Sequence, residues 1–289
     1  MKKFMRSELI PNGEFVTIDG HRMHIFRTGN VNRPKLVFMS GSGTGAPVYD
    51  FKVLYEKLSS DFRIIVIEKF GYGYSDLYDG PQDIDTLVEQ QRTALQELGE
   101  AGPFILLPHS YSGLEAIRWT QKYPEDIKAI AGLDMATPVT YIEWGEEELA
   151  KRAKQMQKLQ NLARKGLLFW YPLNKRCLTK DEIIQQKLLW KRNAMNDCVI
   201  TGSKVVVSNA KLIAEGGAID CPVILFVSNG KQVSKNWIEH EREFAKRTNA
   251  EYVQLNCGHY VHYYESDRIK NEIIRFVSRR NCNLVEALV

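Results

Sequence analysis

Three side chains of this sequence have the types and positions for nucleophilic catalysis: Ser110, Asp134 and His259. Each one ends or follows a strand-like run. A serine hydroxyl is a weak nucleophile at neutral pH, so it needs a histidine that takes its proton and an acid that orients the histidine. Together the three residues predict acyl transfer through a covalent acyl-enzyme.

The residues around Ser110 predict a sharp turn between a strand and a helix. The apolar run Phe104–Leu107 leads toward Ser110, and a helical pattern begins at Ser112. Such a turn holds a serine hydroxyl above the edge of a sheet, and its usual pattern has glycine two residues to either side of the serine. This chain has Pro108 and Ser112 there. The alternative is an ordinary turn serine that caps a helix.

His259 follows Cys257-Gly258, just past the last expected strand. A general base reaches over a sheet from this kind of loop. His262 is the competing histidine, but it already belongs to the approach to the final helix. We therefore expect His259 to be the base. The alternative is that His259 has no catalytic role and is a loop histidine whose ring is hydrogen bonded to water.

The segment that usually carries the acid holds no carboxylate in this chain. This segment, Ser228–Gln232, follows the strand expected over Pro222–Val227. Asp220 precedes the same strand and so lies at its opposite end. Asn229 and the glutamates of the helix expected over Lys235–Arg247 remain as alternatives.

Asp134 stands at the end of the neighbouring expected strand, Ile127–Leu133. It lies 24 residues after Ser110 (134 − 110), which leaves room for one helix, one turn and one strand. Both residues then emerge at the same carboxyl edge of a parallel sheet, where open α/β sheets carry their sites. We expect Asp134 to be the acid; the alternative is that it caps the turn before Pro138.

A glycine-rich loop, Ser40–Gly45, follows the strand expected over Lys35–Met39. It lacks the Lys-Ser/Thr ending of a phosphate-binding P-loop, and its glycine spacing differs from that of a dinucleotide fingerprint. A loop that turns back toward the serine can instead donate a backbone N–H to an oxyanion. We expect the backbone N–H groups of Ser42 and Tyr111 to form the oxyanion hole.

The order of elements along the chain predicts the scaffold for these residues. Strands alternate with helices, which implies an α/β fold with a mostly parallel twisted sheet and helices on both faces. Two early runs, joined by Asp19-Gly20, predict a hairpin that forms an antiparallel edge. The expected strands are Glu14–Ile18, His21–Arg27, Lys35–Met39, Arg63–Ile67, Phe104–Leu107, Ile127–Leu133, Pro222–Val227 and Glu251–Leu255, and the expected helices are Tyr49–Leu58, Asp83–Glu100, Ser112–Lys122, Lys235–Arg247 and Asp267–Arg279.

The pattern changes to helical spacing between residues 139 and 217. We expect residues 1–138 and 218–289 to form the core domain and residues 139–217 to form a helical cap over its site. Trp144 and Trp170 lie in this insertion and are the expected substrate-binding side chains. Aromatic residues at helical spacing also serve as the core of a cap, and this remains the alternative.

With these motifs in view, the chain resembles the α/β-hydrolase fold superfamily from Phe15 to Val277. The similar segments are Ser-Gly-Ser-Gly, Phe-Gly-Tyr-Gly-Tyr-Ser, Pro-His-Ser-Tyr-Ser-Gly and Cys-Gly-His-Tyr. Leu133–Pro138 is similar to the segment that carries the acid in the pancreatic-lipase branch. The resemblance implies a Ser–His–Asp hydrolase with a cap over its site.

We expect a serine hydrolase that cleaves a carboxylic ester with a small or medium apolar acyl group. A prolyl-type aminopeptidase is the alternative within the enzymes, and Glu146–Glu148 could hold its substrate amine. The alternative that is not an enzyme is a ligand-binding protein on a hydrolase scaffold. Dehalogenases and epoxide hydrolases use a carboxylate nucleophile, so Ser110 argues against both.

The composition excludes several classes of partner, which leaves the small ester-like substrate as the expected one. The chain has 289 residues and a formal net charge of +4, with both signs spread along it, so neither nucleic acid nor a membrane is expected. The five cysteines form no CxxC pair, so no disulfide framework or metal site is expected. No apolar segment follows the first residues, which indicates a cytoplasmic protein. No cofactor is expected, and the oligomeric state is left open.

Overall fold

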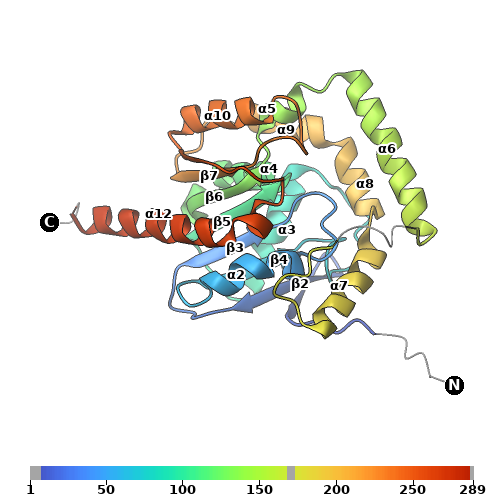
Figure 1. Cartoon of the computed structure of the whole chain (residues 1–289), viewed down its shortest axis with the longest axis horizontal. Coiled ribbons are helices and arrows are strands. Elements are labelled where there is room, and N and C mark those ends of the chain that lie inside the picture. Colours follow the sequence, from blue (N-terminus) through green and yellow to red (C-terminus); the bar gives the residue numbers. More distant parts are fainter. Residues whose placement is uncertain (1–7, 168–172, 287–289) are drawn as a thin grey trace.

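An eight-stranded sheet runs through the molecule, as Figure 1 shows for the computed structural model, which describes residues 8–167 and 173–286. The strand order is β1-β2-β4-β3-β5-β6-β7-β8. Strands β1 and β2 are antiparallel to their neighbours, and the other pairs are parallel. The strands are β1 Glu14–Ile18, β2 His21–Thr28, β3 Lys35–Met39, β4 Arg63–Glu68, β5 Phe104–Ser110, β6 Ile127–Met135, β7 Val223–Val227 and β8 Glu251–Gln254.

The sequence explains why the strands from β3 to β8 are parallel and the edge formed by β1 and β2 is antiparallel. Strand β7 reads Val-Ile-Leu-Phe-Val and is buried throughout, as expected for a parallel strand that helices cover on both faces. The β1–β2 hairpin turns at Asp19 and Gly20, whose φ angles are 51° and 77°. These angles suit a two-residue turn with the twist of a hairpin. The predicted antiparallel edge is confirmed.

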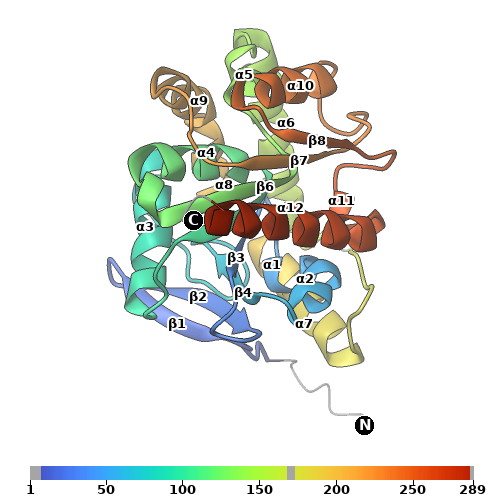
Figure 2. The same cartoon turned by 90° about the vertical axis from the view of Figure 1, so that its left-hand side faces the viewer.

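Helices cover both faces of the sheet (Figure 2). Helices α3, α4 and α10 bury their apolar residues with one face, and α1, α2 and α12 with the other. The helices are α1 Pro47–Asp50, α2 Lys52–Leu58, α3 Ile84–Glu97, α4 Ser112–Lys122, α5 Pro138–Ile142, α6 Glu146–Arg164, α7 Lys180–Asn193, α8 Asp197–Lys204, α9 Val206–Glu215, α10 Trp237–Thr248, α11 Val261–Tyr264 and α12 Ser266–Glu286.

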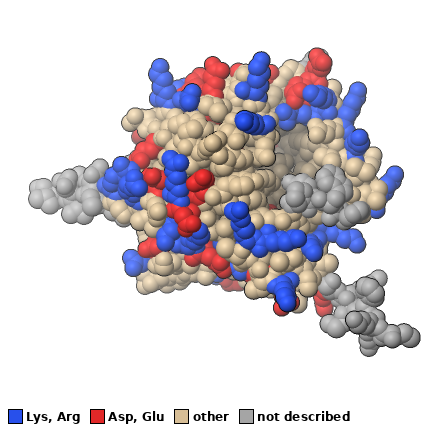
Figure 3. Space-filling model, viewed as in Figure 1, with Lys and Arg blue, Asp and Glu red and all other residues tan. Residues whose placement is uncertain are grey.

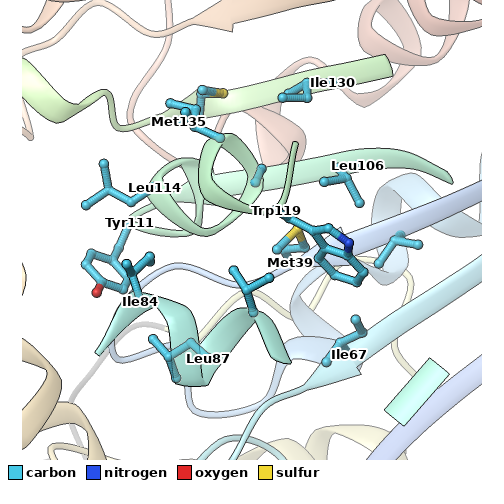
Figure 4. Close-up of a cluster of buried hydrophobic side chains, with 14 of the residues drawn as sticks. Met39, Ile67, Ile84, Leu87, Leu106, Tyr111, Leu114, Trp119, Ile130 and Met135 are labelled. Atoms are coloured by element: carbon cyan, nitrogen blue, oxygen red, sulfur yellow. The ribbon is translucent and has the colours of Figure 1, made fainter. Parts of the chain in front are cut away.

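The apolar cluster below α4 fixes the position of the turn at the end of β5 (Figure 4). Trp119 and Leu114 of α4 are fully buried, together with Leu106 of β5 and Ile130 of β6. Full burial of a large apolar side chain contributes about 1.5–3 kcal/mol to stability. The helix that follows Ser110 is therefore held against the sheet along its length.

The described residues between 139 and 217 form helices and no strand. Helix α7 of this region contacts two core loops directly. Asn193 Nδ2 donates to the backbone oxygens of Gly45 and Gly73 at 2.9 and 2.7 Å, and Arg192 donates to Ser75 O at 2.8 Å. Helices α6, α7 and α8 stand along the right-hand side of Figure 1.

Charged side chains of both signs are intermixed on the face shown in Figure 3. Among the described residues, no helix combines the length and the apolar character that crossing a membrane requires.

Candidate active site

Ser110 lies in the strained turn that the sequence predicts. Strand β5 ends at Ser110 and helix α4 begins two residues later. Its φ angle is 54°, in the left-handed region that a residue with a side chain adopts at a cost of order 1–3 kcal/mol. Such a conformation persists only where the surroundings enforce it, and it is typical of a turn that presents a nucleophile.

Two glycines bring neighbouring backbones close to this turn. A Cβ atom on Gly41 would lie 2.8 Å from Ser110 Cβ, and one on Gly113 would lie 2.2 Å from Ala136 O. Both distances are shorter than real Cβ contacts, so neither position accepts a larger residue without a shift of the backbone. The loop after β3 and the end of β6 therefore both pack directly against the turn.

The two departures from the usual glycine pattern are accommodated in different ways. Ser112 Oγ accepts from the backbone N–H of His109 at 2.9 Å, and it lies 2.8 Å from Met39 O. Its hydroxyl thus links β5 to β3 where a glycine would leave only space. Pro108 stands opposite Met39 in the β3–β5 pair, near the end of the ladder, where a missing N–H is tolerated.

Asp134 and His259 lie within hydrogen-bonding distance of each other. Asp134 Oδ2 is 2.6 Å from His259 Nδ1. The other carboxylate oxygen accepts from Ser228 N at 2.7 Å and from Trp237 Nε1 at 2.8 Å. Asp134 is fully buried, and a buried carboxylate needs such donors to offset its loss of water.

Ser110 and Asp134 belong to adjacent parallel strands. Ser110 is opposite Met135 in the β5–β6 pair, so the serine and the acid lie at the same carboxyl edge. His109, the residue before Ser110, places its ring 4.6 Å from the ring of His259. The topology thus brings all three residues of the expected triad to one edge of the sheet.

Asn229 and Glu241, two of the alternatives to Asp134, are not hydrogen bonded to His259 in the described part of the chain. Asn229 Oδ1 accepts from the backbone N–H of Lys231, a local turn. Glu241 of α10 is fully buried, and neither of its carboxyl oxygens has a partner among the described residues. Burial raises the pKa of Glu241 well above its ordinary value, and the nearby Asp134 raises it further. Asp134 is the residue that the structure places against His259.

Three histidine rings gather at this edge, and they differ in their surroundings. Burial lowers the pKa of His109 well below its ordinary value, and it lowers the pKa of His262 to about 3, in both cases with a further contribution from His259. These two rings are therefore neutral at physiological pH. The side chain of His259 is 16% exposed and is the one that contacts a carboxylate.

The expected oxyanion donors lie on both sides of Ser110. Tyr111 is the residue before α4, and Ser42 lies in the exposed part of the loop after β3. Within the described part of the chain, the backbone N–H of neither residue is hydrogen bonded. Gly43 N donates to Tyr72 Oη at 3.2 Å, which ties this loop to the loop after β4.

The two expected substrate-binding tryptophans have different outcomes. Trp144 packs edge-on against Tyr141, with ring centroids 4.7 Å apart, and the Arg152 guanidinium lies 3.9 Å from the centre of its ring. Its ring thus contacts other residues of the same region. Trp170 lies outside the described residues.

A cavity of about 460 Å³ lies between the core and the helices of residues 139–217. The core contributes Thr44 to Ala46, at the end of the expected oxyanion loop, and also Gln232 and Tyr260, which adjoin His259. Arg176 and Trp190 line it from the opposite side. Among the described residues, no three His, Cys, Asp or Glu side chains have an arrangement that could hold a metal ion.

Asp50 also lines this cavity, and the sequence analysis does not identify it. Its Oδ1 accepts from Tyr263 Oη at 2.9 Å and from Gln186 Nε2 at 3.3 Å. Burial raises its pKa to about 7 against the effect of these two hydrogen bonds. The signal in the sequence is a single acid in the otherwise apolar run Ala46–Phe51.

Replacing Asp50 with asparagine should make stability less dependent on pH. The folded carboxyl has a pKa of about 7, above the ordinary value of 3.8, so the folded state keeps this proton where the unfolded chain has lost it. Wild-type stability therefore falls as pH rises between these values, and asparagine removes that loss. Relative to wild type, the variant should gain about 2.5 kcal/mol between about pH 5 and about pH 8.

Urea unfolding at the two pH values measures this difference. The exposed Asp61→Asn is the matched control and should shift little. An Asp50→Asn difference that stayed constant with pH would contradict the raised pKa.

Replacing Asp134 with asparagine should keep the shape of the site and lower kcat for any hydrolytic reaction by up to about 10⁴. Asparagine lacks the charge that stabilises a protonated His259 and orients its ring. Asn229→Ala is the matched control, and it should cost much less. Steady-state kinetics on both variants measure the effect. A larger loss in Asn229→Ala than in Asp134→Asn would indicate that Asn229, and not Asp134, orients His259.

A family model of the alpha/beta hydrolase fold matches residues 35–168. YbdG of Bacillus subtilis (strain 168), an uncharacterized protein, is 46% identical over 132 residues, which are 46% of this chain and 40% of that protein. The match covers less than half the length of YbdG and of two further curated relatives, an epoxide hydrolase of Caenorhabditis elegans and a protein of Schizosaccharomyces pombe.

Solved structures match over nearly the whole chain. Haloalkane dehalogenase DbeA from Bradyrhizobium elkani USDA94 gives a TM-score of 0.73 at 16% identity, over 93% of this chain and 98% of that one. The enol-lactonase from Burkholderia xenovorans LB400 gives a TM-score of 0.66 at 17% identity, over 92% and 100%. At these identities the likeness concerns the fold alone.

Proposed function

Because the chain belongs to the α/β-hydrolase fold superfamily, we propose that it is a serine hydrolase that cleaves a carboxylic ester through an acyl-enzyme. Ser110 is the nucleophile, His259 the general base and Asp134 the acid. The acyl group is small or medium and apolar. The observation that carries this proposal is the 2.6 Å contact between Asp134 and His259 at the edge where β5 presents Ser110.

The first half of the reaction forms the acyl-enzyme. His259 takes the proton of the Ser110 hydroxyl, and Oγ attacks the ester carbonyl. The tetrahedral oxyanion accepts hydrogen bonds from the N–H groups of Ser42 and Tyr111, worth about 3–4 kcal/mol per donor in related chemistry. His259 then gives its proton to the leaving alcohol as the C–O bond breaks.

The second half returns the serine. A water molecule gives its proton to His259 and attacks the acyl carbonyl, and the acid product leaves as Ser110 recovers its proton. Asp134 stays ionised throughout, because it stabilises the protonated ring rather than taking the proton itself.

The nature of residue 110 separates this chemistry from that of dehalogenases and epoxide hydrolases. Those enzymes attack with a carboxylate, and a serine hydroxyl in its place forms an acyl-enzyme from an ester instead. The enol-lactonase, by its name, acts on a lactone, which is a cyclic ester. At 17% identity that likeness concerns the fold, so the choice of ester cleavage rests on Ser110.

The aminopeptidase alternative needs a carboxylate in residues 146–148 for the substrate amine. Glu148 is already paired, since its Oε1 accepts from Arg152 Nε at 2.6 Å. A paired carboxylate binds an amine less strongly, so the ester reading is favoured.

A fluorophosphonate probe tests the proposal, because it phosphonylates a serine only when the serine is activated. We expect the intact protein to gain one probe mass, and the peptide that carries it to contain Ser110. The exposed Ser60→Ala should label like wild type. An unlabelled protein would indicate a ligand-binding role on the same fold.

A further inference from the structure

We propose that the cavity beside His259 binds a protonated amino group on the alcohol side of the substrate, with Asp50 as its counter-ion. The proposal rests on the ester hydrolysis described above and names the class of ester: one whose leaving group carries a cationic amine.

Asp50 has one oxygen free for such a ligand. The side chain of Asp50 is largely buried, with the residue 8% exposed, and it lines the cavity. Both of its hydrogen bonds are accepted by Oδ1, and within the described residues Oδ2 accepts none. A buried carboxyl with an unused oxygen gains most from a ligand that brings a positive charge and an N–H donor.

Aromatic side chains line the same cavity as this carboxyl. Tyr260 and Tyr263 both line the cavity, and their rings stack with centroids 4.9 Å apart and planes 13° apart. Trp190 and Tyr264 line it as well. Aromatic faces attract organic cations within about 6 Å, so the walls and the carboxyl favour the same kind of ligand.

Two of the residues that line the cavity, Gln232 and Tyr260, adjoin His259. Tyr260 directly follows His259, and Gln232 Oε1 accepts from the His259 backbone N–H at 2.9 Å. The base of a triad gives its proton to the leaving oxygen, so the alcohol portion is held next to the base. A pocket flanked by Gln232 and Tyr260 therefore contacts the alcohol portion rather than the acyl group.

Arg176 is the other charged side chain that lines the cavity. It is exposed, and its guanidinium donates to Tyr263 O. Charges in contact with water are screened far more strongly than buried ones. Asp50, which is nearly buried, therefore dominates the interaction with a group inside the cavity.

Two acetate esters of matched shape test the proposal. They are 2-(dimethylamino)ethyl acetate and 3-methylbutyl acetate, which differ by a protonated nitrogen in place of a CH group. At about pH 7.5 the wild-type protein should have a kcat/KM at least tenfold higher for the amino ester, about the effect of one partly buried ion pair.

The variant Asp50→Asn should bring this ratio close to one, chiefly by lowering kcat/KM for the amino ester. Asparagine keeps an oxygen that accepts from Tyr263 and Gln186, so the surrounding structure is preserved. The exposed Asp61→Asn is the control and should keep the wild-type ratio.

Each outcome separates this inference from the proposed function. Hydrolysis of both esters at a ratio that Asp50→Asn leaves unchanged overturns the inference alone. A third ester, the acetate ester of 3-hydroxypropanoate, carries a negative charge instead. The inference is also overturned if the wild-type protein prefers this ester to the amino ester and Arg176→Gln removes the preference. If the protein hydrolyses neither of the two esters, the result contradicts the proposed function rather than this inference.

Binding to Ser110→Ala tests the cavity without turnover. In this variant, calorimetry should show the amino ester binding at least tenfold more tightly than the neutral ester. The double variant with Asp50→Asn should remove the difference. Equal binding of the two esters to Ser110→Ala overturns the inference whether or not the wild-type protein hydrolyses either one.

Discussion

Replacing Ser110 with alanine should lower kcat for ester hydrolysis by about 10⁶, the loss typical for the nucleophile of a triad. The variant keeps His259, Asp134 and the backbone N–H groups of the oxyanion loop. Water attack without a covalent intermediate is all that remains, and it proceeds at a small residual rate. The reason for so large an effect is that the neighbouring hydroxyls are engaged elsewhere: Ser112 Oγ bonds His109 N and Met39 O, and Tyr111 Oη accepts from Asn209.

Hydrolysis of p-nitrophenyl acetate and the fluorophosphonate labelling described above measure this loss together. Circular dichroism and thermal unfolding should show an intact fold, since only one oxygen is removed. Ser60→Ala is the matched control and should retain full activity. An alanine variant that kept most of its esterase activity would refute the role of Ser110.

Replacing His259 with alanine should cost a similar factor of about 10⁶ in kcat, because nothing else in the site then takes the serine proton. The neighbouring histidines do not substitute for it. His262 is buried with both ring nitrogens unpartnered among the described residues, and burial lowers its pKa to about 3. His109 is likewise buried, with its pKa lowered by burial.

The variant His262→Gln is the comparison for this measurement and should stay within about tenfold of wild-type kcat, since neither ring nitrogen of His262 has a hydrogen-bond partner among the described residues. Both variants are assayed with the same esters, and thermal unfolding reports whether either is misfolded. A folded His262→Gln without activity, beside an active His259→Ala, would exchange the two roles.

The sequence by itself determined the elements that carry the site. The apolar runs that became β3, β5 and β7 are short and bounded by loop signals, and their burial makes them strands whatever surrounds them. The strand–serine–helix pattern at Ser110 is equally local, because the turn needs only small residues nearby. The order of strands and helices then implied the parallel sheet, which the structure confirms.

Local patterns were less reliable where a helix is interrupted. The spacing predicts one helix over Tyr49–Leu58, but the structure has α1 and α2 meeting at Phe51. Phe51 is fully buried against Phe38 and the ring of His262. Contacts with strand β3 and with helix α11, more than 200 residues away along the chain, thus decide where this helix breaks.

The identity of the residue against His259 depended on tertiary structure. Asp134, Asn229 and a helix glutamate were all compatible with the sequence, because each could reach the same edge of the sheet. The hydrogen bonds from Ser228 and Trp237, 94 and 103 residues away along the chain, make a buried charge tolerable at Asp134. No local pattern records donors that arrive from so far along the chain.

The role suggested for Asp50 also came from tertiary structure alone. In the sequence it is one acid within an apolar run, without a partner at any regular spacing. Folding brings Tyr263 and Gln186 to its Oδ1 from 213 and 136 residues away, and it makes Asp50 one of the residues that line the cavity. The sequence thus determined which strands and turns form, since these depend on neighbours. Which polar groups meet inside the molecule depended on packing between distant segments, because burial and hydrogen-bond donors are properties of the assembled fold.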